Sequence, residues 1–249
     1  MKPTRLVEFS TLEAKCAYLD KKRMRMEYKF IQSCPATLSQ KLIQRGWRRF
    51  GEYYSRPNCV DCNDCLSIRI DADKYRFSKS AKRTIRKNRS TKIMVQKPTI
   101  SHQHLNLYEK YHKHMEEKKG WKHYSLTPNS YHELYACGAM TFGKEILYFV
   151  GDKLVGVDLV DFLEDGLSSI YFFYDPDYSH LSLGRFSMYQ QIYIAQTNKL
   201  PWVYLGYYVE KCPSLNYKAD YKPFEVLEGD PSLDESPSWI KGELNQKEL

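Results

Sequence analysis

The sequence has no hydrophobic run long enough to form a membrane helix. Crossing a bilayer takes ~20 consecutive apolar residues, and no stretch of this 249-residue chain approaches that length. The N-terminal segment MKPTRLVEFSTLEAKC also lacks the apolar core of a signal peptide. We therefore expect a soluble, cytoplasmic protein.

Other common signals are also missing. Seven cysteines is an odd number, and without a secretion signal it does not fit a disulfide framework. The chain contains no internal repeat and no Gly-rich phosphate loop. Among the seven histidines, we interpret the close pair His112-Lys-His114 as part of a helix surface. None of the common nucleotide-binding or histidine–metal patterns is therefore present.

The charge is distributed unevenly along the chain. Residues 1–157 carry 31 Lys and Arg against 15 Asp and Glu, whereas residues 158–249 carry 7 against 15. A basic half favours a polyanionic partner, because neutralising phosphates releases counterions. The alternative is a solvated charged face, but the clustering of the basic residues argues against it.

The densest basic cluster lies in residues 78–92, SKSAKRTIRKNRSTK, which contain no acidic residue. Several of these side chains share one face at helical spacing, where like charges repel one another. An anionic partner would relieve that cost, so we predict contacts to RNA phosphate or ribose. The alternative is a solvated amphipathic helix. The predicted contacts come from Lys79, Lys82, Arg83, Arg86, Lys87 and Arg89.

Hydrophobic periodicity predicts an α+β fold. The first 35 residues look irregular. We expect helices over residues 36–45, 78–88, 105–120, 130–139 and 183–196, and strands over residues 47–54, 66–70, 146–150, 154–162, 168–174 and 202–208. Gly151-Asp152-Lys153 separates two of these strands as a hairpin turn. The polar, acidic segment beyond Gly229 is expected to be poorly ordered.

Three segments carry a family resemblance. They are RGWRRFG at residues 45–51 with the following cysteine cluster up to Arg69, SSIYFFYDPDYSHLSLG at residues 168–184, and YLGYYVEKCPSLNYK at residues 204–218. Together they resemble the bacterial aspartate/glutamate leucyltransferases and, more distantly, the eukaryotic arginyl-tRNA–protein transferases. The resemblance runs from about Cys16 to about Leu227.

The resemblance implies a reaction and a fold. Members of this family transfer an amino acid from aminoacyl-tRNA to proteins that begin with Asp or Glu, which marks those proteins for degradation. The C-terminal region is similar to an acyl-CoA N-acyltransferase (GNAT-like) domain that uses tRNA in place of coenzyme A. We accordingly expect a cysteine-rich, basic subdomain at residues 1–95, a GNAT-like domain at 96–229 and a polar tail at 230–249.

The cysteine cluster has the spacing of a ligand set. Cys59, Cys62 and Cys65 form a C-x-x-C-x-x-C pattern that suits zinc or an iron–sulfur cluster. The resemblance suggests Cys16 as the fourth ligand. Eukaryotic relatives carry a CxxC there, whereas this chain has Leu19. The alternative is that reduced cysteines pack a small subdomain.

The candidate catalytic residues lie in the second half. The resemblance places an acidic residue at Asp161, on a predicted core strand, where it could deprotonate or orient the amine. An ionised carboxylate inside a strand must be paired or used, and the alternative is a structural salt bridge. Tyr207, Asn216 and Lys218, from the third motif, are the polar groups expected near the reacting ester.

Arginines around the cysteine cluster are candidates to bind the acceptor's acidic side chain, because guanidinium pairs with carboxylate in a bidentate way. They are Arg48, Arg49 and Arg69, and the alternative for each is a surface or structural charge. Aminolysis of an ester needs positioning and oxyanion stabilisation but no cofactor and no acyl-enzyme. Two alternative functions remain: arginyl instead of leucyl transfer, and a non-catalytic RNA-binding module.

Overall fold

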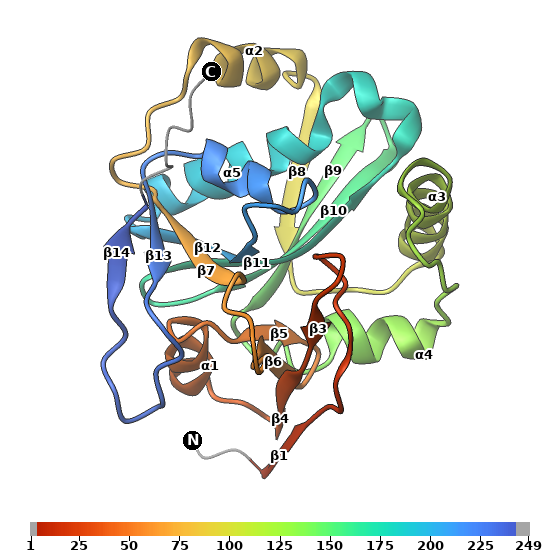
Figure 1. Cartoon of the computed structure of the whole chain (residues 1–249). Coiled ribbons are helices and arrows are strands. Elements are labelled where there is room, and N and C mark those ends of the chain that lie inside the picture. Colours follow the sequence, from red (N-terminus) through yellow and green to blue (C-terminus); the bar gives the residue numbers. More distant parts are fainter. Residues whose placement is uncertain (1–3, 243–249) are drawn as a thin grey trace.

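The computed structural model describes residues 4–242 and confirms the mixed α and β composition. Its main feature is an eight-stranded sheet in the order β14-β13-β7-β12-β11-β10-β9-β8 (Figure 1). Neighbouring strands are antiparallel except for the β11–β12 pair, which is parallel. The strands are β7 (Leu66–Asp71), β8 (Thr91–Gln96), β9 (Gly143–Val150), β10 (Lys153–Phe162), β11 (Gly166–Tyr174), β12 (Trp202–Tyr208), β13 (Phe224–Leu227) and β14 (Trp239–Lys241).

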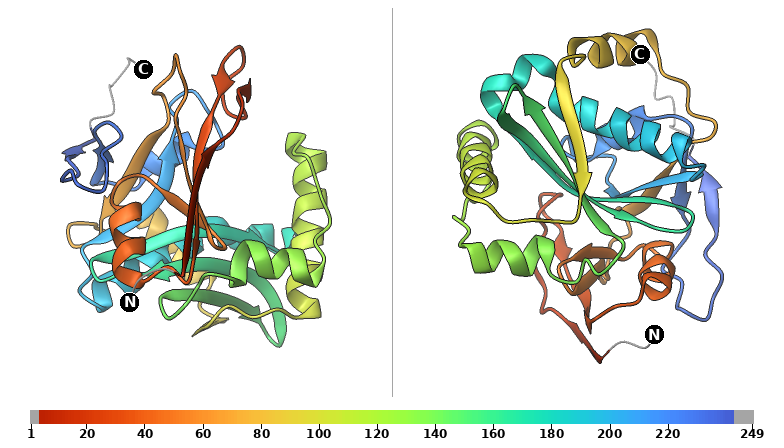
Figure 2. Two further views of the ribbon diagram at one scale, coloured as in Figure 1. Left: turned by 90° about the horizontal axis from the view of Figure 1, so that it is seen from below. Right: turned by 180° about the vertical axis from the view of Figure 1, so that it is seen from behind.

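A second, four-stranded sheet is built from the N-terminal residues. Its order is β1-β4-β6-β5, from β1 (Arg5–Ser10), β4 (Met26–Gln32), β5 (Arg48–Phe50) and β6 (Tyr53–Pro57). The helix α1 (Ala36–Ile43) packs against it around Ile31, Leu42 and Tyr54. Between β1 and β4 the chain forms a short hairpin from β2 (Ala14–Lys15) and β3 (Arg23–Met24). In Figure 1 and in the rear view of Figure 2 this sheet lies below the large one.

Helices cover both faces of the large sheet. On one face, α5 (Leu183–Thr197) packs against β11 and β12, and α2 (Lys79–Lys87) packs against α5. On the other face, α3 (His102–Lys119) packs against β10 and β11. The remaining turns are α4 (Pro128–Tyr131), the π-helical η1 (His132–Ala136) and the 3-10 helices η2 (Pro176–Leu181) and η3 (Asn216–Asp220). No helix within residues 4–242 is long and apolar enough to cross a membrane.

The sheet separates between its two parallel strands. β11 and β12 pair over only three positions, from Gly166–Trp202 to Ser168–Tyr204, although both strands continue further. Because parallel strands that stop pairing leave backbone groups free, this split creates space for a side chain or a ligand. It lies where the two sheets meet, and the candidate site is built around it.

The two sheets do not follow the predicted subdomain boundaries. β7, and all of β8 except its last residue, lie before residue 96, and they pair with β12 and β9 in the large sheet. The segment after Gly229 also contributes to this sheet, because β14 pairs with β13 and the Trp239 indole donates to the carbonyl of Gln44 at 3.1 Å. The boundaries at residues 95 and 229 therefore divide one sheet, and residues 230–242 are docked on the protein.

Candidate functional site

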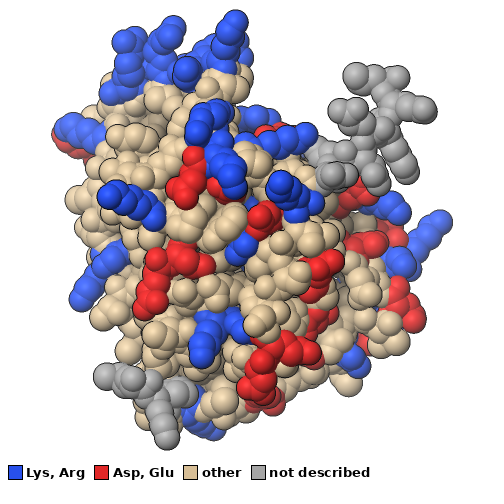
Figure 3. Space-filling view, turned by 90° about the vertical axis from the view of Figure 1, so that its left-hand side faces the viewer, with Lys and Arg blue, Asp and Glu red and all other residues tan. Residues whose placement is uncertain are grey.

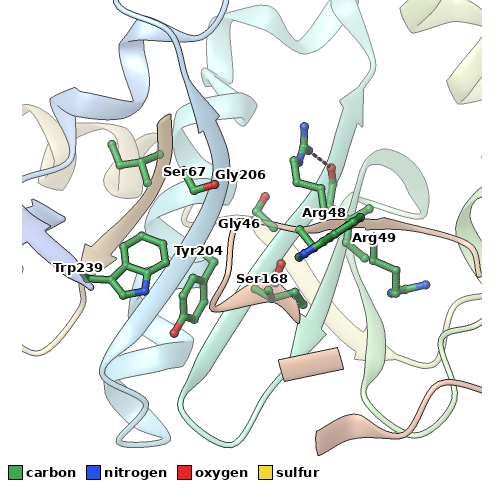
Figure 4. Close-up of a pocket in the computed structure, with 13 residues that line it drawn as sticks. Gly46, Arg48, Arg49, Ser67, Ser168, Tyr204, Gly206 and Trp239 are labelled. Atoms are coloured by element: carbon green, nitrogen blue, oxygen red, sulfur yellow. Dashed lines mark hydrogen bonds between the residues drawn. The ribbon is translucent and has the colours of Figure 1, made fainter. Parts of the chain in front are cut away.

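Arg48 reaches into the split between β11 and β12. Its Nη2 donates to the carbonyl of Ile170 on β11 at 3.1 Å, and its guanidinium lies 5.3 Å from the ring centre of Tyr207 on β12. It lines a narrow pocket together with Ser168, Ser169 and other residues from both sheets (Figure 4). Within residues 4–242 no carboxylate lies at salt-bridge distance from Arg48. Its positive charge is therefore available to an anionic ligand.

Gly206 makes room for that arginine. It has a φ of +71°, which favours glycine, and a Cβ at this position would lie 2.4 Å from Arg48 Nε. The register of β12 also shifts between Tyr204 and Gly206. The glycine of the motif Tyr204-Leu-Gly206 is thus explained by the close approach of Arg48.

Lys218 stabilises the same part of β12 from behind. Its buried Nζ donates to the carbonyls of Leu205, at 2.8 Å, and Tyr207, at 2.6 Å, on either side of Gly206. Burial, and secondly the charge of Arg48, hold the pKa of Lys218 well below its usual range. The structure therefore places this predicted catalytic lysine behind the split, where it holds the strand that forms its wall.

The other two polar candidates of this motif differ in position. Tyr207 is buried, and its hydroxyl donates to the carbonyl of Ser55 at 2.8 Å, so this phenol links β12 to the small sheet. Burial raises its pKa. Asn216 is exposed at the start of η3. The aromatic ring of Tyr207 contacts Arg48, but neither polar group lines the pocket.

Arg49 and Asp161 form a buried bidentate ion pair. Arg49 Nε and Nη2 each lie 2.7 Å from an oxygen of Asp161, and Nη1 donates to the carbonyls of Gly51 and Cys137. The side chains are 1% and 0% exposed. Burial lowers the pKa of Arg49, but the Asp161 carboxylate outweighs it and the pKa is raised. Arg49 and Asp161 therefore pair with each other. This is the geometry of a structural salt bridge, which was the alternative interpretation of Asp161.

Arg69 is also engaged. Its Nε and Nη2 lie 3.0 and 2.6 Å from Glu225 Oε2. The guanidinium lies between the rings of Trp202, at 3.6 Å, and Trp239, at 4.4 Å. Of the three predicted acceptor-binding arginines, the structure leaves Arg48 alone facing the split without a carboxylate partner in the described residues.

The predicted RNA-binding residues form an exposed surface. Ser78 caps α2 by accepting from the Ala81 amide at 3.1 Å, and Ala81 and Thr84 face the protein. The basic side chains point outward, and in Figure 3 Lys and Arg gather at the top of the molecule, where Figure 1 places α2. The exposed residues are Lys79, Lys82, Arg83, Arg86, Lys87 and Arg89.

The end of this basic helix lies next to the start of α5. Asn88 Nδ2 donates to the carbonyl of Leu181 at 2.8 Å, and Lys87 Nζ lies 3.4 Å from the carbonyl of His180. α5 packs against β11 and β12 and connects them in the chain, so the C-terminal end of α2 lies at the start of the helix that joins the two strands of the split.

The four predicted metal ligands lie near one another. Cys59 and Cys62 form a β-bridge. Burial, and then the charges of the Cys16, Cys59 and Cys62 thiolates, raise the pKa of Cys65 to about 12. Among the residues that the structure describes, however, no three His, Cys, Asp or Glu side chains are arranged to hold a metal. As placed, these thiols do not form the predicted site, and a zinc or iron–sulfur site at Cys16, Cys59, Cys62 and Cys65 stays a prediction.

A set of hydrogen-bonded polar side chains beside the pocket was given no role from the sequence. Asp158 on β10 is completely buried, and Gln191 on α5 donates to both of its carboxylate oxygens, at 3.1 and 2.9 Å. The same amide lies 3.3 Å from Ser169 Oγ. A charged residue in the otherwise apolar stretch Leu-Val-Gly-Val-Asp-Leu-Val, residues 154–160, is the signal that could have identified it.

Comparison with known proteins places the chain in a family. Residues 14–83 match the family described as arginine-tRNA-protein transferase, N terminus, and residues 103–228 match arginine-tRNA-protein transferase, C terminus. Among solved structures, L-PGS from Bacillus licheniformis is similar with a TM-score of 0.41 and 13% identity, over 57% of this chain and 45% of that one.

These matches define the class: the chain belongs to the arginine-tRNA-protein transferase family and, within it, to the bacterial aspartate/glutamate leucyltransferases. The aspartate/glutamate leucyltransferase of Campylobacter jejuni is 54% identical over 92% of this chain and 96% of the relative. That of Helicobacter hepaticus is 42% identical over 94% and 98%. The resemblance carried by the three sequence motifs is confirmed.

Proposed function

We propose that this protein transfers leucine from Leu-tRNA to the N-terminal amine of proteins that begin with Asp or Glu, and so marks them for degradation. The similar relatives named aspartate/glutamate leucyltransferase support this function. The observation that carries it in the structure is Arg48, a cation without a carboxylate partner in the described residues, located in the split of the main sheet.

The sheet supports a GNAT-like frame for this reaction. β9, β10 and β11 run antiparallel, α5 then crosses over, and β12 returns parallel to β11 before the two strands separate. We assign the split to the reacting aminoacyl ester and the acceptor's amine. Tyr207 and Lys218 shape its β12 wall, and Asp161 holds Arg49 so that the neighbouring Arg48 is fixed in position.

We assign the acceptor's acidic side chain to Arg48 and the tRNA to α2. A carboxylate one short side chain from the reacting amine can replace the Ile170 carbonyl as the partner of the Arg48 guanidinium. The α2 face carries exposed cations and ends beside the loop that leads into α5, so a bound RNA backbone can continue from there toward the split.

The chemistry requires few groups. The nucleophile is an α-amine with a pKa of ~7.7–8, so a useful fraction is neutral near pH 7. The ester is already activated, and the enzyme contributes mainly orientation and stabilisation of the developing oxyanion. This reaction needs no cofactor from the protein.

A transfer assay tests the proposal. Leu-tRNA and Arg-tRNA are offered in parallel to peptides that begin with Asp, Glu, Asn or Gln, and labelled amino acid in the peptide is measured. We expect transfer from Leu-tRNA to the Asp and Glu peptides. Transfer from Arg-tRNA instead would identify an arginyltransferase. Tight tRNA binding without transfer from either donor would favour the non-catalytic RNA-binding alternative.

A further inference from the structure

Three hydrogen-bonded polar side chains, Asp158, Gln191 and Ser169, connect the middle of β10 to the split. Asp158 is 0% exposed and has no cationic partner within the described residues; its hydrogen bonds come from uncharged groups. Burial raises its pKa to about 7, against the opposing effect of the Gln191 hydrogen bonds. A carboxylate in such surroundings is costly, so its retention in a core strand needs a reason.

The carboxylate fixes the orientation of the Gln191 amide. An ionised carboxylate only accepts hydrogen bonds, so the NH2 group of Gln191 must face Asp158 and not the amide oxygen. One hydrogen of Nε2 serves the carboxylate, and the other points to Ser169 Oγ at 3.3 Å. The amide oxygen, Oε1, is buried without a hydrogen-bond partner in the described part of the chain.

That orientation decides what Ser169 can do. Its oxygen accepts from Gln191, so the hydroxyl hydrogen is left to donate in another direction. Ser169 lines the pocket that holds Arg48. It is also the first residue of β11 beyond the last position that pairs with β12, which places it where the split begins. Its hydroxyl hydrogen is therefore left to donate at a residue that lines the closed end of the split.

We propose that Ser169 is a catalytic residue that donates its hydroxyl hydrogen to the carbonyl oxygen of the aminoacyl ester, and that Gln191 and Asp158 are positioning residues that act through it. This inference rests on the proposed function. As the acceptor's amine forms the new C–N bond, negative charge develops on that oxygen. The bond from the carbonyl carbon to the ribose oxygen then breaks, and the proton that the amine loses ends on the tRNA hydroxyl. Ser169 keeps its own hydrogen throughout.

Ser169→Ala and Asp158→Asn should both lower kcat, because each removes the hydrogen bond from Ser169 to the ester oxygen. Ser169→Ala removes the donor and is expected to lower kcat about 100-fold, the usual loss for one oxyanion donor, with KM for Leu-tRNA unchanged. Asp158→Asn removes the charge and one of the two acceptor oxygens that hold the NH2 group of Gln191, so the glutamine amide is free to turn over. Its oxygen then captures the Ser169 hydrogen, and kcat should fall nearly as far.

The double variant tests whether the residues act as one chain. Ser169→Ala/Asp158→Asn should be no slower than Ser169→Ala alone, because the donor can be lost only once. Ser169→Thr keeps a hydroxyl and should recover most of the rate. Ser187→Ala is the matched control, since it removes a buried α5 hydroxyl that donates to the Gly184 carbonyl, outside the pocket. Rates are measured at about pH 8, where the carboxylate is ionised, and circular dichroism verifies folding.

The outcomes separate this inference from the function on which it rests. Full activity of Ser169→Ala, or losses that multiply in the double variant, would overturn the role of Ser169 while leaving leucyl transfer intact. The two Ser169 variants decide the matter even if Asp158→Asn does not fold. Absence of transfer by the unsubstituted protein would overturn the proposed function and this role together.

Discussion

Two neighbouring arginines on β5 have opposite fates, and the difference follows from strand geometry. Successive side chains on a strand point to opposite faces. Arg48 therefore enters the split of the large sheet, whereas Arg49 turns to Asp161 and is buried. Both were predicted from the sequence to bind the acceptor, because the sequence alone does not show which side of a short strand faces a ligand.

The Arg49–Asp161 pair is expected to stabilise the fold and to take no part in proton transfer. Asp161→Asn leaves a buried guanidinium without its counter-charge, which costs on the order of 3–5 kcal/mol. Chemical denaturation should report this loss, while kcat per folded molecule stays within about tenfold of the parent. Asp165→Asn is the matched control, because that carboxylate accepts from Tyr204 and Gln44 and has no cationic partner in the described residues.

Replacing both partners distinguishes the two roles of Asp161. An apolar pair, Arg49→Met/Asp161→Leu, should regain much of the lost stability. If this double variant is stable but inactive, the pair does more than stabilise the fold, and Asp161 is again a candidate for the base predicted from the sequence.

At the scale of elements, periodicity predicted three strands of the second half and three helices well. The strands β10, β11 and β12 and the helices α2, α3 and α5 lie within a few residues of the expected ranges. The first 35 residues were expected to be irregular and instead contain β1 and β4. β1 is exposed along its whole length, so it lacks the alternation of buried and exposed residues that signals a strand.

The basic helix α2 is expected to dock the tRNA backbone. Lys82, Arg83 and Arg86 are exposed and have no ion-pair partner within residues 4–242. Changing all three to Glu should weaken Leu-tRNA binding and reduce the slope of log K against log salt by about 2 to 3. A salt titration of binding measures this slope. Lys118, Lys119 and Lys122 changed to Glu give a control with the same change in net charge, at the far end of α3. An equal loss of slope in the control would show that the helix has no special role.

At the scale of the whole molecule, the site depends on contacts that no local pattern reveals. The small sheet delivers Arg48, the third motif supplies Gly206 and Lys218, and the second supplies Ile170 and Ser169. The motifs identified these segments through resemblance. Their meeting at the split depends on the pairing of β12 with β11 and with β7, and the β7 pairing links residues more than 130 positions apart.

Selection of the acceptor by this assembly should depend on a single arginine. Arg49 and Arg69 are held by Asp161 and Glu225, so discrimination between acidic and neutral N-termini should depend on Arg48. A charge-assisted pair of roughly 1.5–3 kcal/mol corresponds to a ~10- to 150-fold preference for Asp or Glu over Asn or Gln. Arg48→Ala should abolish this preference while slow transfer to neutral N-termini survives, and Arg48→Lys should restore only part, because an ammonium cannot bind the carboxylate through two parallel hydrogen bonds. Transfer rates for the four peptides measure it, with Arg56→Ala as a control on the same small sheet, where Arg56 pairs with Glu27. If Arg48→Ala keeps the acidic preference, the carboxylate is recognised elsewhere, and the basic residues Lys79 and Lys82 of α2 become the next candidates.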